Sequence, residues 1–206
     1  MAWIEPIAVV LGVLGVWLTI RQSIWCWPIG IVQVVLYIAI FYRVKLYSDV
    51  ILQIIYVVLQ VSGWWHWHHG RSAHGPLNVS RLISSHLIGW VVIALVGTVS
   101  WGWGMATFTD AEVPYWDAFI AVTSLIAQWL MTRKRLESWL FWLAVDLVAV
   151  GVYLSKALFL TSGLYAIFLV MAVMGFLAWR RSFAASLRDG IGNEDGTDTW
   201  EIRSSS

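Results

Sequence analysis

The sequence predicts an all-α integral membrane protein with seven transmembrane helices, and three observations support this prediction. The chain of 206 residues is 60% apolar and 12% charged, with a mean hydropathy of +0.74, whereas soluble domains are about 25% charged. Seven apolar stretches are long enough to cross a bilayer, which takes roughly 20 residues. Lys and Arg gather in alternate connections between these stretches, as they do in multi-pass membrane proteins.

The seven expected spans follow one another along nearly the whole chain. Some of these spans are slightly shorter than the usual length, which is acceptable because Trp, Tyr or Arg at the ends can anchor a shorter helix. The last segment has no apolar period and is rich in Gly, Asp, Ser and Thr, so we expect a disordered tail over 182–206. The spans are expected at 4–21, 27–43, 49–68, 84–104, 115–132, 138–155 and 160–180.

The distribution of basic residues predicts the orientation. On one side of the membrane, the expected connections between spans carry only three basic residues, namely Arg43, Lys45 and Lys156. Connections rich in Lys and Arg stay in the cytoplasm, so the N-terminus is expected outside and the C-terminus in the cytoplasm. The expected cytoplasmic side carries Arg21, Arg71, Arg81, the run 133–135, Arg180, Arg181, Arg188 and Arg203.

An internal repeat is visible when the chain is shifted along itself so that Arg21 falls on Arg133. At this shift several residues of the first half, among them three tryptophans and Leu18 on Leu130, fall on identical residues of the second half, and a slip of one residue in the middle adds Tyr42 on Tyr153 and Lys45 on Lys156. With this alignment, Gln33 and Asp146 come within one residue of equivalence. The matching pairs are Trp17 with Trp129, Trp27 with Trp139, Trp67 with Trp179, and Gly63 with Gly175.

Each repeat holds three spans, so a single linker helix is needed to give both copies the same orientation. We therefore expect a 3+1+3 layout of parallel repeats, an architecture known in transporters that bind substrate near the membrane midplane. The expected units are a first three-helix bundle over 1–69, a cytoplasmic loop and linker helix over 70–110, and a second bundle over 111–181.

The most unusual polar residue is Asp146, a carboxylate inside the apolar span 138–155. A charge at that depth costs at least a few kcal/mol, so such residues usually face a cavity or a partner. Trp139, Trp142 and Asp146 share one helical face, and two indoles beside a carboxylate suit an organic cation. Alternatively, Asp146 pairs with a group on another helix, and the tryptophans belong to an interfacial belt.

Two further spans carry uncharged polar faces. Gln53, Tyr56 and Gln60 lie at i, i+3 and i+7 on the third span, and Gln33 and Tyr37 lie at i and i+4 on the second. Such groups often serve only to hold helices together. Polar faces on three helices favour a shared cavity for a small-molecule substrate.

Other classes of function receive little support. His66, His68, His69 and His74 crowd one loop, but they lack a clear ligand geometry, so no metal is expected. The single cysteine, Cys26, excludes an internal disulfide. No nucleotide-binding loop or catalytic triad is visible, so we expect neither an enzyme, nor a cofactor, nor a nucleic-acid partner.

The motifs resemble those of the PnuC family of bacterial nicotinamide riboside transporters. The resemblance rests on the pattern "KLY…LQ…GW..W" over 45–67, on "WD" at 116–117, on "TRK..E.W" over 132–139 and on the pair Trp139 and Trp142. It extends from the first span through Trp179.

The resemblance implies a fold similar to the full-length SWEET sugar transporters, an inner-membrane location and a homotrimer as a candidate assembly. It also implies uptake of nicotinamide riboside by facilitated diffusion, with trapping by a cytoplasmic kinase. Family members carry Asn where this chain has Gln33 and Asp146, so thiamine and riboflavin stay open as substrates. A proton-coupled carrier that titrates Asp146 and a non-transporting scaffold are the rival functions.

Overall fold

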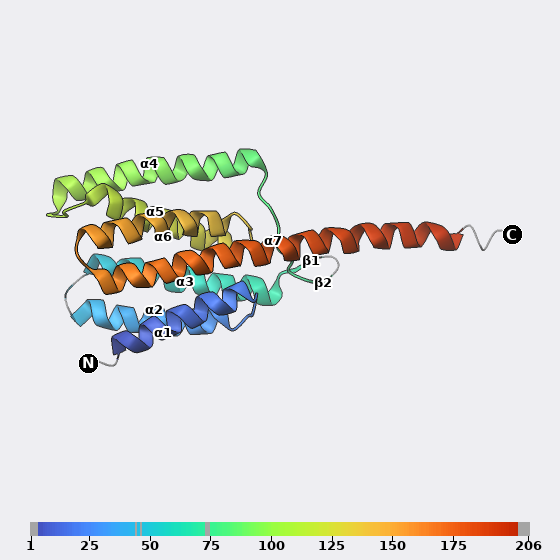
Figure 1. Ribbon diagram of the computed structural model, residues 1–206, viewed down its shortest axis with the longest axis horizontal. Coiled ribbons are helices and arrows are strands. Elements are labelled where there is room, and N and C mark those ends of the chain that lie inside the picture. Colours follow the sequence, from blue (N-terminus) through green and yellow to red (C-terminus); the bar gives the residue numbers. More distant parts are fainter. Residues whose placement is uncertain (1–3, 44, 46, 73–74, 202–206) are drawn as a thin grey trace.

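The computed structural model describes residues 4–43, 45, 47–72 and 75–201 (Figure 1). Within these residues the chain folds into seven α-helices and one short β-hairpin. The hairpin pairs β1 (Arg71–Ser72) with β2 (Gly75–Pro76) between the third and fourth helices. The helices are α1 (Ile4–Ile20), α2 (Cys26–Arg43), α3 (Tyr47–His69), α4 (Ser84–Phe108), α5 (Pro114–Thr132), α6 (Ser138–Ser155) and α7 (Phe159–Glu201).

Six of the helices form a closed ring, and the seventh lies outside it. Following the contacts around the ring, α1 packs on α2, α2 on α3, α3 on α5, α5 on α6, α6 on α7, and α7 on α1. Helix α4 packs against α5 and forms the outermost layer at one side of the molecule (Figure 1). A ring of this kind surrounds an interior that all six helices can line.

Five helices are long and apolar enough to cross a membrane, namely α2, α3, α4, α6 and α7. The apolar part of α1, Pro6–Ile20, is shorter than a full span. Helix α5 contains Asp117, Thr123, Ser124 and Gln128, and several of its residues are buried against its neighbours. The seven expected helices are therefore all present, and the two that fall short as independent spans are members of the ring.

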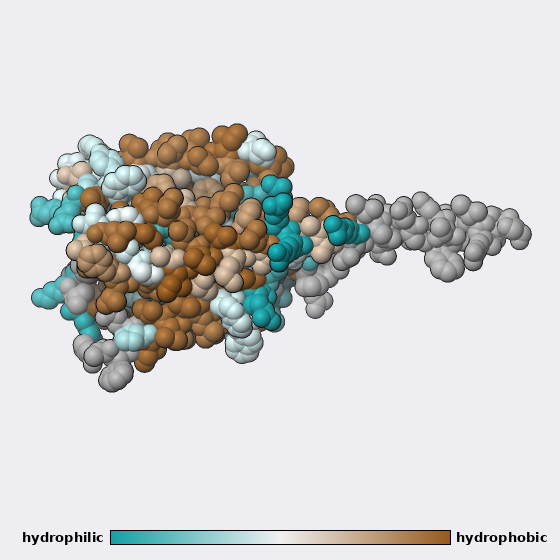
Figure 2. Space-filling view, viewed as in Figure 1, coloured by the Kyte–Doolittle hydropathy of each residue, from teal (hydrophilic) through white to brown (hydrophobic). Residues whose placement is uncertain are grey.

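The surface has an apolar band between two polar ends (Figure 2). One end, which we call the basic end, holds the α1–α2 turn, the α5–α6 turn and the connection from α3 to α4, and α7 extends beyond it (Figure 1). At the opposite end, Lys156 and Asp117 lie 4.0 Å apart and join the end of α6 to the start of α5.

Helix α7 continues through Glu201, over residues for which the sequence predicts a disordered tail. The residues just beyond the apolar span, "SFAASLR", favour helix, since Ala, Leu and Arg are strong helix formers. Phe183 also packs against the apolar cluster that contains Leu136. Residues 202–206 lie outside the described part of the chain.

The helix boundaries of the first half of the chain recur in the second half at a constant distance along the sequence. This distance is the one that separates Gln22 from Lys134, and we call it the repeat spacing. It separates the ends of α1 and α5, the starts of α3 and α7, and both ends of α2 and α6. Gln22 and Lys134 both have positive φ, at 53° and 49°, as do Lys45 and Ala157, at 61° and 56°. Because the spacing is constant, the expected slip that paired Lys45 with Lys156 is wrong. Without the slip, Asp146 corresponds to Val34, and Gln33 corresponds to Val145.

The connection before α4 is fastened to the α5–α6 turn. Ser80 donates to the Lys134 carbonyl at 3.0 Å and accepts from the Leu136 N–H at 2.9 Å. The Glu137 carboxylate accepts a hydrogen bond from the Leu82 N–H at 2.9 Å and pairs with Arg81 Nε at 3.4 Å. These bonds hold α4 to the part of the ring formed by α5 and α6.

Candidate functional site

Asp146 lies on α6 and is buried, with 4% of its surface exposed. Among the residues that the structure describes, its carboxylate has no hydrogen-bond or ion-pair partner, so the structure does not provide the pairing that a purely structural acid would need. The phenol of Tyr165, on α7, lies within electrostatic range of this carboxylate. An unpaired buried acid is expensive, which makes Asp146 the centre of the candidate site.

An aromatic row on α6 and α7 continues from this point. Tyr153 and Tyr165 stack with ring centres 5.2 Å apart, and Phe168 meets Tyr165 edge-on at 6.1 Å. Phe168 in turn reaches Gly12 on α1, where the side-chain amide of Gln33 also lies. The row therefore runs from α6 through α7 to the position on α1 where Gln33, one of the predicted polar residues of α2, also lies.

Two other predicted residues lie at helix contacts. The Tyr56 hydroxyl donates a hydrogen bond to Ser124 Oγ and so joins α3 to α5. The Gln60 amide is buried against Gly30 of α2, where a Cβ atom would overlap it. Tyr165 lies within electrostatic range of Tyr56 as well as Asp146.

The remaining predicted residues are less central. Gln53 is partly buried on α3. Tyr37 stacks on Phe41 of its own helix, with ring centres 5.7 Å apart. Trp142 is partly buried and packs against both apolar clusters of the protein. Part of its indole thus stays accessible one turn from Asp146.

Trp139 has a different environment from Trp142. Its side chain is 2% exposed, and its ring covers Gly175 on α7. It also meets Trp179 edge-on, with ring centres 5.5 Å apart. In this conformation Trp139 is a packing residue of the basic end, although it shares a helical face with Asp146.

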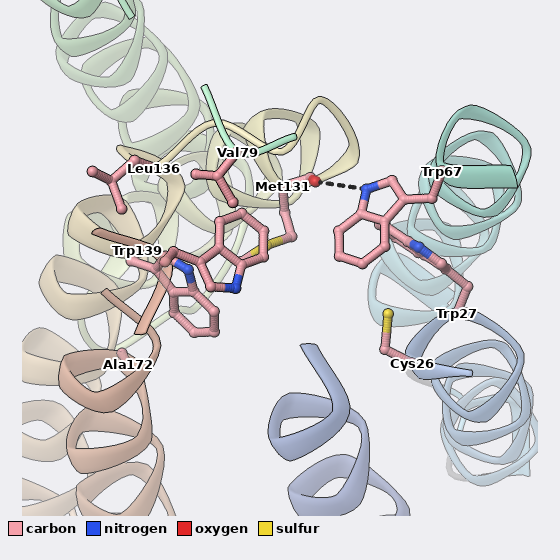
Figure 3. Packing of buried hydrophobic residues seen from close by; sticks show 9 residues of the cluster. Cys26, Trp27, Trp67, Val79, Met131, Leu136, Trp139 and Ala172 are labelled. Carbon is pink, nitrogen blue, oxygen red and sulfur yellow. Dashed lines mark hydrogen bonds between the residues drawn. The ribbon is translucent and has the colours of Figure 1, made fainter. Parts of the chain in front are cut away.

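Four tryptophans close the basic end of the ring, and they form two equivalent pairs. Trp27 meets Trp67 edge-on at 5.2 Å, as Trp139 meets Trp179. Trp67 donates its indole N–H to the Met131 carbonyl at 3.3 Å (Figure 3), and Trp179 donates to the Thr19 carbonyl at 3.1 Å. Each donor and each acceptor is separated from its counterpart by the repeat spacing. The two halves of the ring therefore exchange the same hydrogen bond in both directions.

Lys134 lies where the two halves meet. Its Nζ lies 4.4 Å from the centre of the Trp67 ring and donates to the Leu77 carbonyl at 2.8 Å. A longer bond of 3.4 Å reaches Oε1 of Gln22, its counterpart in the first half. Burial lowers the pKa of Lys134, because desolvation disfavours the charged amine. A cation–π contact and two oxygen acceptors favour the charged form.

The histidines of α3 make contacts with each other and with a neighbouring indole. His69 stacks on Trp65 at 3.8 Å and bonds its carbonyl, and His68 meets His69 edge-on. No group of three His, Cys, Asp or Glu side chains gathers within the described ranges. His74 lies outside those ranges.

Sequence reasoning missed Tyr165 and Ser124, although the repeat contained a signal for both. Tyr165 follows Gln53, one of the predicted polar residues, at the repeat spacing, and Ser124 follows Gly12 in the same way. Phe168 likewise follows Tyr56 at this spacing. The contacts Tyr56–Ser124 and Phe168–Gly12 are thus equivalent, and each joins one half of the ring to the other.

Comparison with known proteins identifies the family. A sequence model of the nicotinamide mononucleotide transporter family matches residues 2–181. The chain belongs to this family. The resemblance to PnuC transporters is thereby confirmed, and the protein is a multi-pass inner-membrane transporter.

The similar proteins are named as transporters of two different vitamins. The nicotinamide riboside transporter PnuC of Escherichia coli is 25% identical over 207 residues, covering 88% of this chain and 87% of that protein. The riboflavin/roseoflavin transporter RibM of Streptomyces davaonensis is also 25% identical, covering 86% and 84%. The crystal structure of the vitamin B3 transporter PnuC superposes with a TM-score of 0.71 at 25% identity, covering 87% of this chain and 81% of the other.

Proposed function

We propose that this protein carries nicotinamide riboside into the cell, with the basic end facing the cytoplasm and the N-terminus outside. The observation that carries this proposal is the buried carboxylate of Asp146, which has no partner among the described residues and lies one turn from the partly accessible ring of Trp142. Nicotinamide riboside has a cationic aromatic ring, which such a site can hold by charge attraction and by contact with aromatic faces.

The transporter is built, in this proposal, from two parallel three-helix repeats joined by the linker helix α4. The first repeat occupies residues 1–69 and the second 111–181. The constant spacing of helix ends and the reciprocal bonds of Trp67 and Trp179 support this arrangement. Parallel repeats related by an axis along the membrane normal place a substrate between them.

Each predicted residue receives a role. Trp142 stacks on the pyridinium ring, and the carboxylate of Asp146 attracts its positive charge. Trp139 lies on the same face of α6, one turn nearer the basic end, and supports the Trp142 side of the site. Tyr165 is added to the set because it lies within electrostatic range of both Asp146 and Tyr56. Polar groups orient the carboxamide and the ribose, a division of labour common in small-molecule sites. These groups are Gln33, Tyr37, Gln53, Tyr56 and Gln60.

Alternating access requires the basic end to open. In the closed arrangement, the four tryptophans and Lys134 join the two repeats. Among the described residues, the indole N–H groups of Trp27 and Trp139 are buried without an acceptor. A buried unpaired donor costs about 1–3 kcal/mol. These costs lower the stability of the closed end, so rocking of one repeat against the other can open it.

Uptake proceeds by facilitated diffusion, and phosphorylation by a cytoplasmic kinase retains the product. Riboflavin is the second candidate substrate, since RibM is as similar to this chain as PnuC of Escherichia coli. Thiamine is a third, because it is also a permanent cation. Proton coupling through Asp146 is the rival mechanism.

Two measurements on the purified full-length protein test the proposal. Calorimetry should detect binding of nicotinamide riboside in preference to riboflavin and thiamine. In liposomes, uptake of nicotinamide riboside should be the same with and without a proton gradient. Selective binding of riboflavin or thiamine would reassign the substrate, and uptake that collapses without the gradient would establish coupling.

A further inference from the structure

A groove opens at the basic end, outside the ring. Its volume is about 340 Å³, at the lower end of the range of ~300–1,000 Å³ for small-molecule sites. Apolar side chains of Leu136, Phe176 and Phe183 line it, and Arg81 and Arg180 add two guanidinium groups. An adjoining hollow of about 270 Å³ shares Arg180 and adds Arg181.

The two guanidinium groups are available to a ligand. The Arg81 side chain is 64% exposed, and within the described part of the chain only its Nε is paired, with the Glu137 carboxylate, which also accepts a hydrogen bond from the Leu82 N–H. Among the residues that the structure describes, the exposed Arg180 makes no hydrogen bond or ion pair. Arginine has five N–H donors in a planar fork, which matches the oxygens of a phosphate.

The groove also crosses from the apolar band to the polar end. Phe176 belongs to the apolar part of α7, and Arg180 lies one turn further along the helix, next to Arg181. Hydrophilic side chains border the apolar band at the basic end (Figure 2). A helix rises about 1.5 Å per residue, so Phe176 and Phe183 are separated by roughly 10 Å along the axis. The wall can therefore contact an acyl chain while the arginines contact a headgroup.

We propose that this groove binds an anionic phospholipid. The phosphate contacts Arg81 and Arg180, and the upper part of one acyl chain lies along Phe176 and Leu136. Basic pockets between membrane helices are suited to such lipids on the cytoplasmic side. Arg81 belongs to the segment fastened to the α5–α6 turn, so the lipid joins that turn to the extension of α7.

Native mass spectrometry of the full-length protein, titrated with phosphatidylglycerol or phosphatidylcholine, tests the site. We expect phosphatidylglycerol to be retained in preference to phosphatidylcholine. Arg180→Gln should raise its apparent dissociation constant several-fold, and the double variant Arg81→Gln/Arg180→Gln about tenfold or more. Arg188→Gln is the matched control, since it removes the same charge from α7 outside the groove, and it should leave binding unchanged.

Ala184→Trp provides a second variant, because it fills the groove without changing any charge. It should also release the lipid, and circular dichroism should show that each variant keeps its helical content. Equal retention of the two lipids, unchanged binding in Arg180→Gln, or an equal loss in Arg188→Gln would overturn the proposal. Binding of soluble glycerol phosphate as tight as that of the lipid would also overturn it, because the apolar wall would then contribute nothing. The proposal does not depend on which vitamin is transported.

Discussion

Lys134 Nζ and Gln22 Oε1 lie 3.4 Å apart, and their residues occupy the same position in the two halves of the chain. Both have positive φ and both follow a ring helix by two residues. The contact therefore crosses from one half of the ring to the other at the basic end. A buried cation here also rests on Trp67, in the cluster that closes this end.

Replacement of Lys134 should loosen the closed end. Lys134→Gln removes the cation–π contact and weakens the bond to the Leu77 carbonyl, so the two halves should separate more often. Cys26 reports this opening, because it lies in the same cluster, is 5% exposed and is the chain's single cysteine. Its labelling by a maleimide should become several-fold faster in the variant.

Arg133→Gln is the control for this measurement. Arg133 precedes Lys134 in the same turn, but its guanidinium lies over Trp129, 4.7 Å from the ring centre. Its replacement should not change the labelling rate. A rate in Lys134→Gln equal to that of the unaltered protein would show that Lys134 does not hold this end closed.

Glycines under the tryptophan rings should be intolerant of a methyl group. A Cβ atom at Gly175 would overlap the Trp139 ring, and one at Gly63 would overlap Trp27. Overpacking of this kind costs typically about 1–3 kcal/mol, so Gly175→Ala and Gly63→Ala should each lower the midpoint of thermal unfolding in detergent by several degrees. Gly163→Ala is the control on the same helix as Gly175, since nothing lies within 4 Å of its Cβ position.

Trp142 and Trp139 should respond differently to substitution. Trp142→Ala removes the partly accessible ring proposed to stack on the substrate, so calorimetry should show at least roughly tenfold weaker binding. Because Trp142 also packs against both apolar clusters, its unfolding midpoint should fall too, but by less than that of Trp139→Ala. Trp139→Ala removes a ring packed on Gly175 and Trp179, so its main effect should be a lower unfolding midpoint. Unchanged substrate affinity in Trp142→Ala would exclude that residue from the site.

Asp146→Asn tests the role of charge in the site. The variant should fold and transport, because an amide preserves the shape of the side chain, but it should bind cationic nicotinamide riboside roughly tenfold more weakly. Binding of neutral riboflavin, where it occurs, should not weaken. A variant that fails to fold would support a structural role for the acid instead.

The sequence alone determined the class of the protein, its helices and its repeat. Composition and the length of apolar stretches are enough for the helices, because a bilayer imposes one length and one kind of surface on every span. The matches of Trp27 with Trp139 and of Trp67 with Trp179 indicate the repeat from the sequence alone, since large aromatic residues rarely recur in order by chance. The family follows from the same motifs.

Only the tertiary structure decided which of the predicted residues meet. Helical periodicity places Trp139, Trp142 and Asp146 on one face, but packing on Gly175 buries Trp139 and leaves Trp142 partly accessible. Tyr165 comes within electrostatic range of Asp146 because α7 packs on α6. Lys134 belongs to a basic run in the sequence, yet contacts with residues 22, 67 and 77 bury it. The pattern within a helix gives the direction of a side chain, whereas the neighbouring helices determine what that side chain contacts.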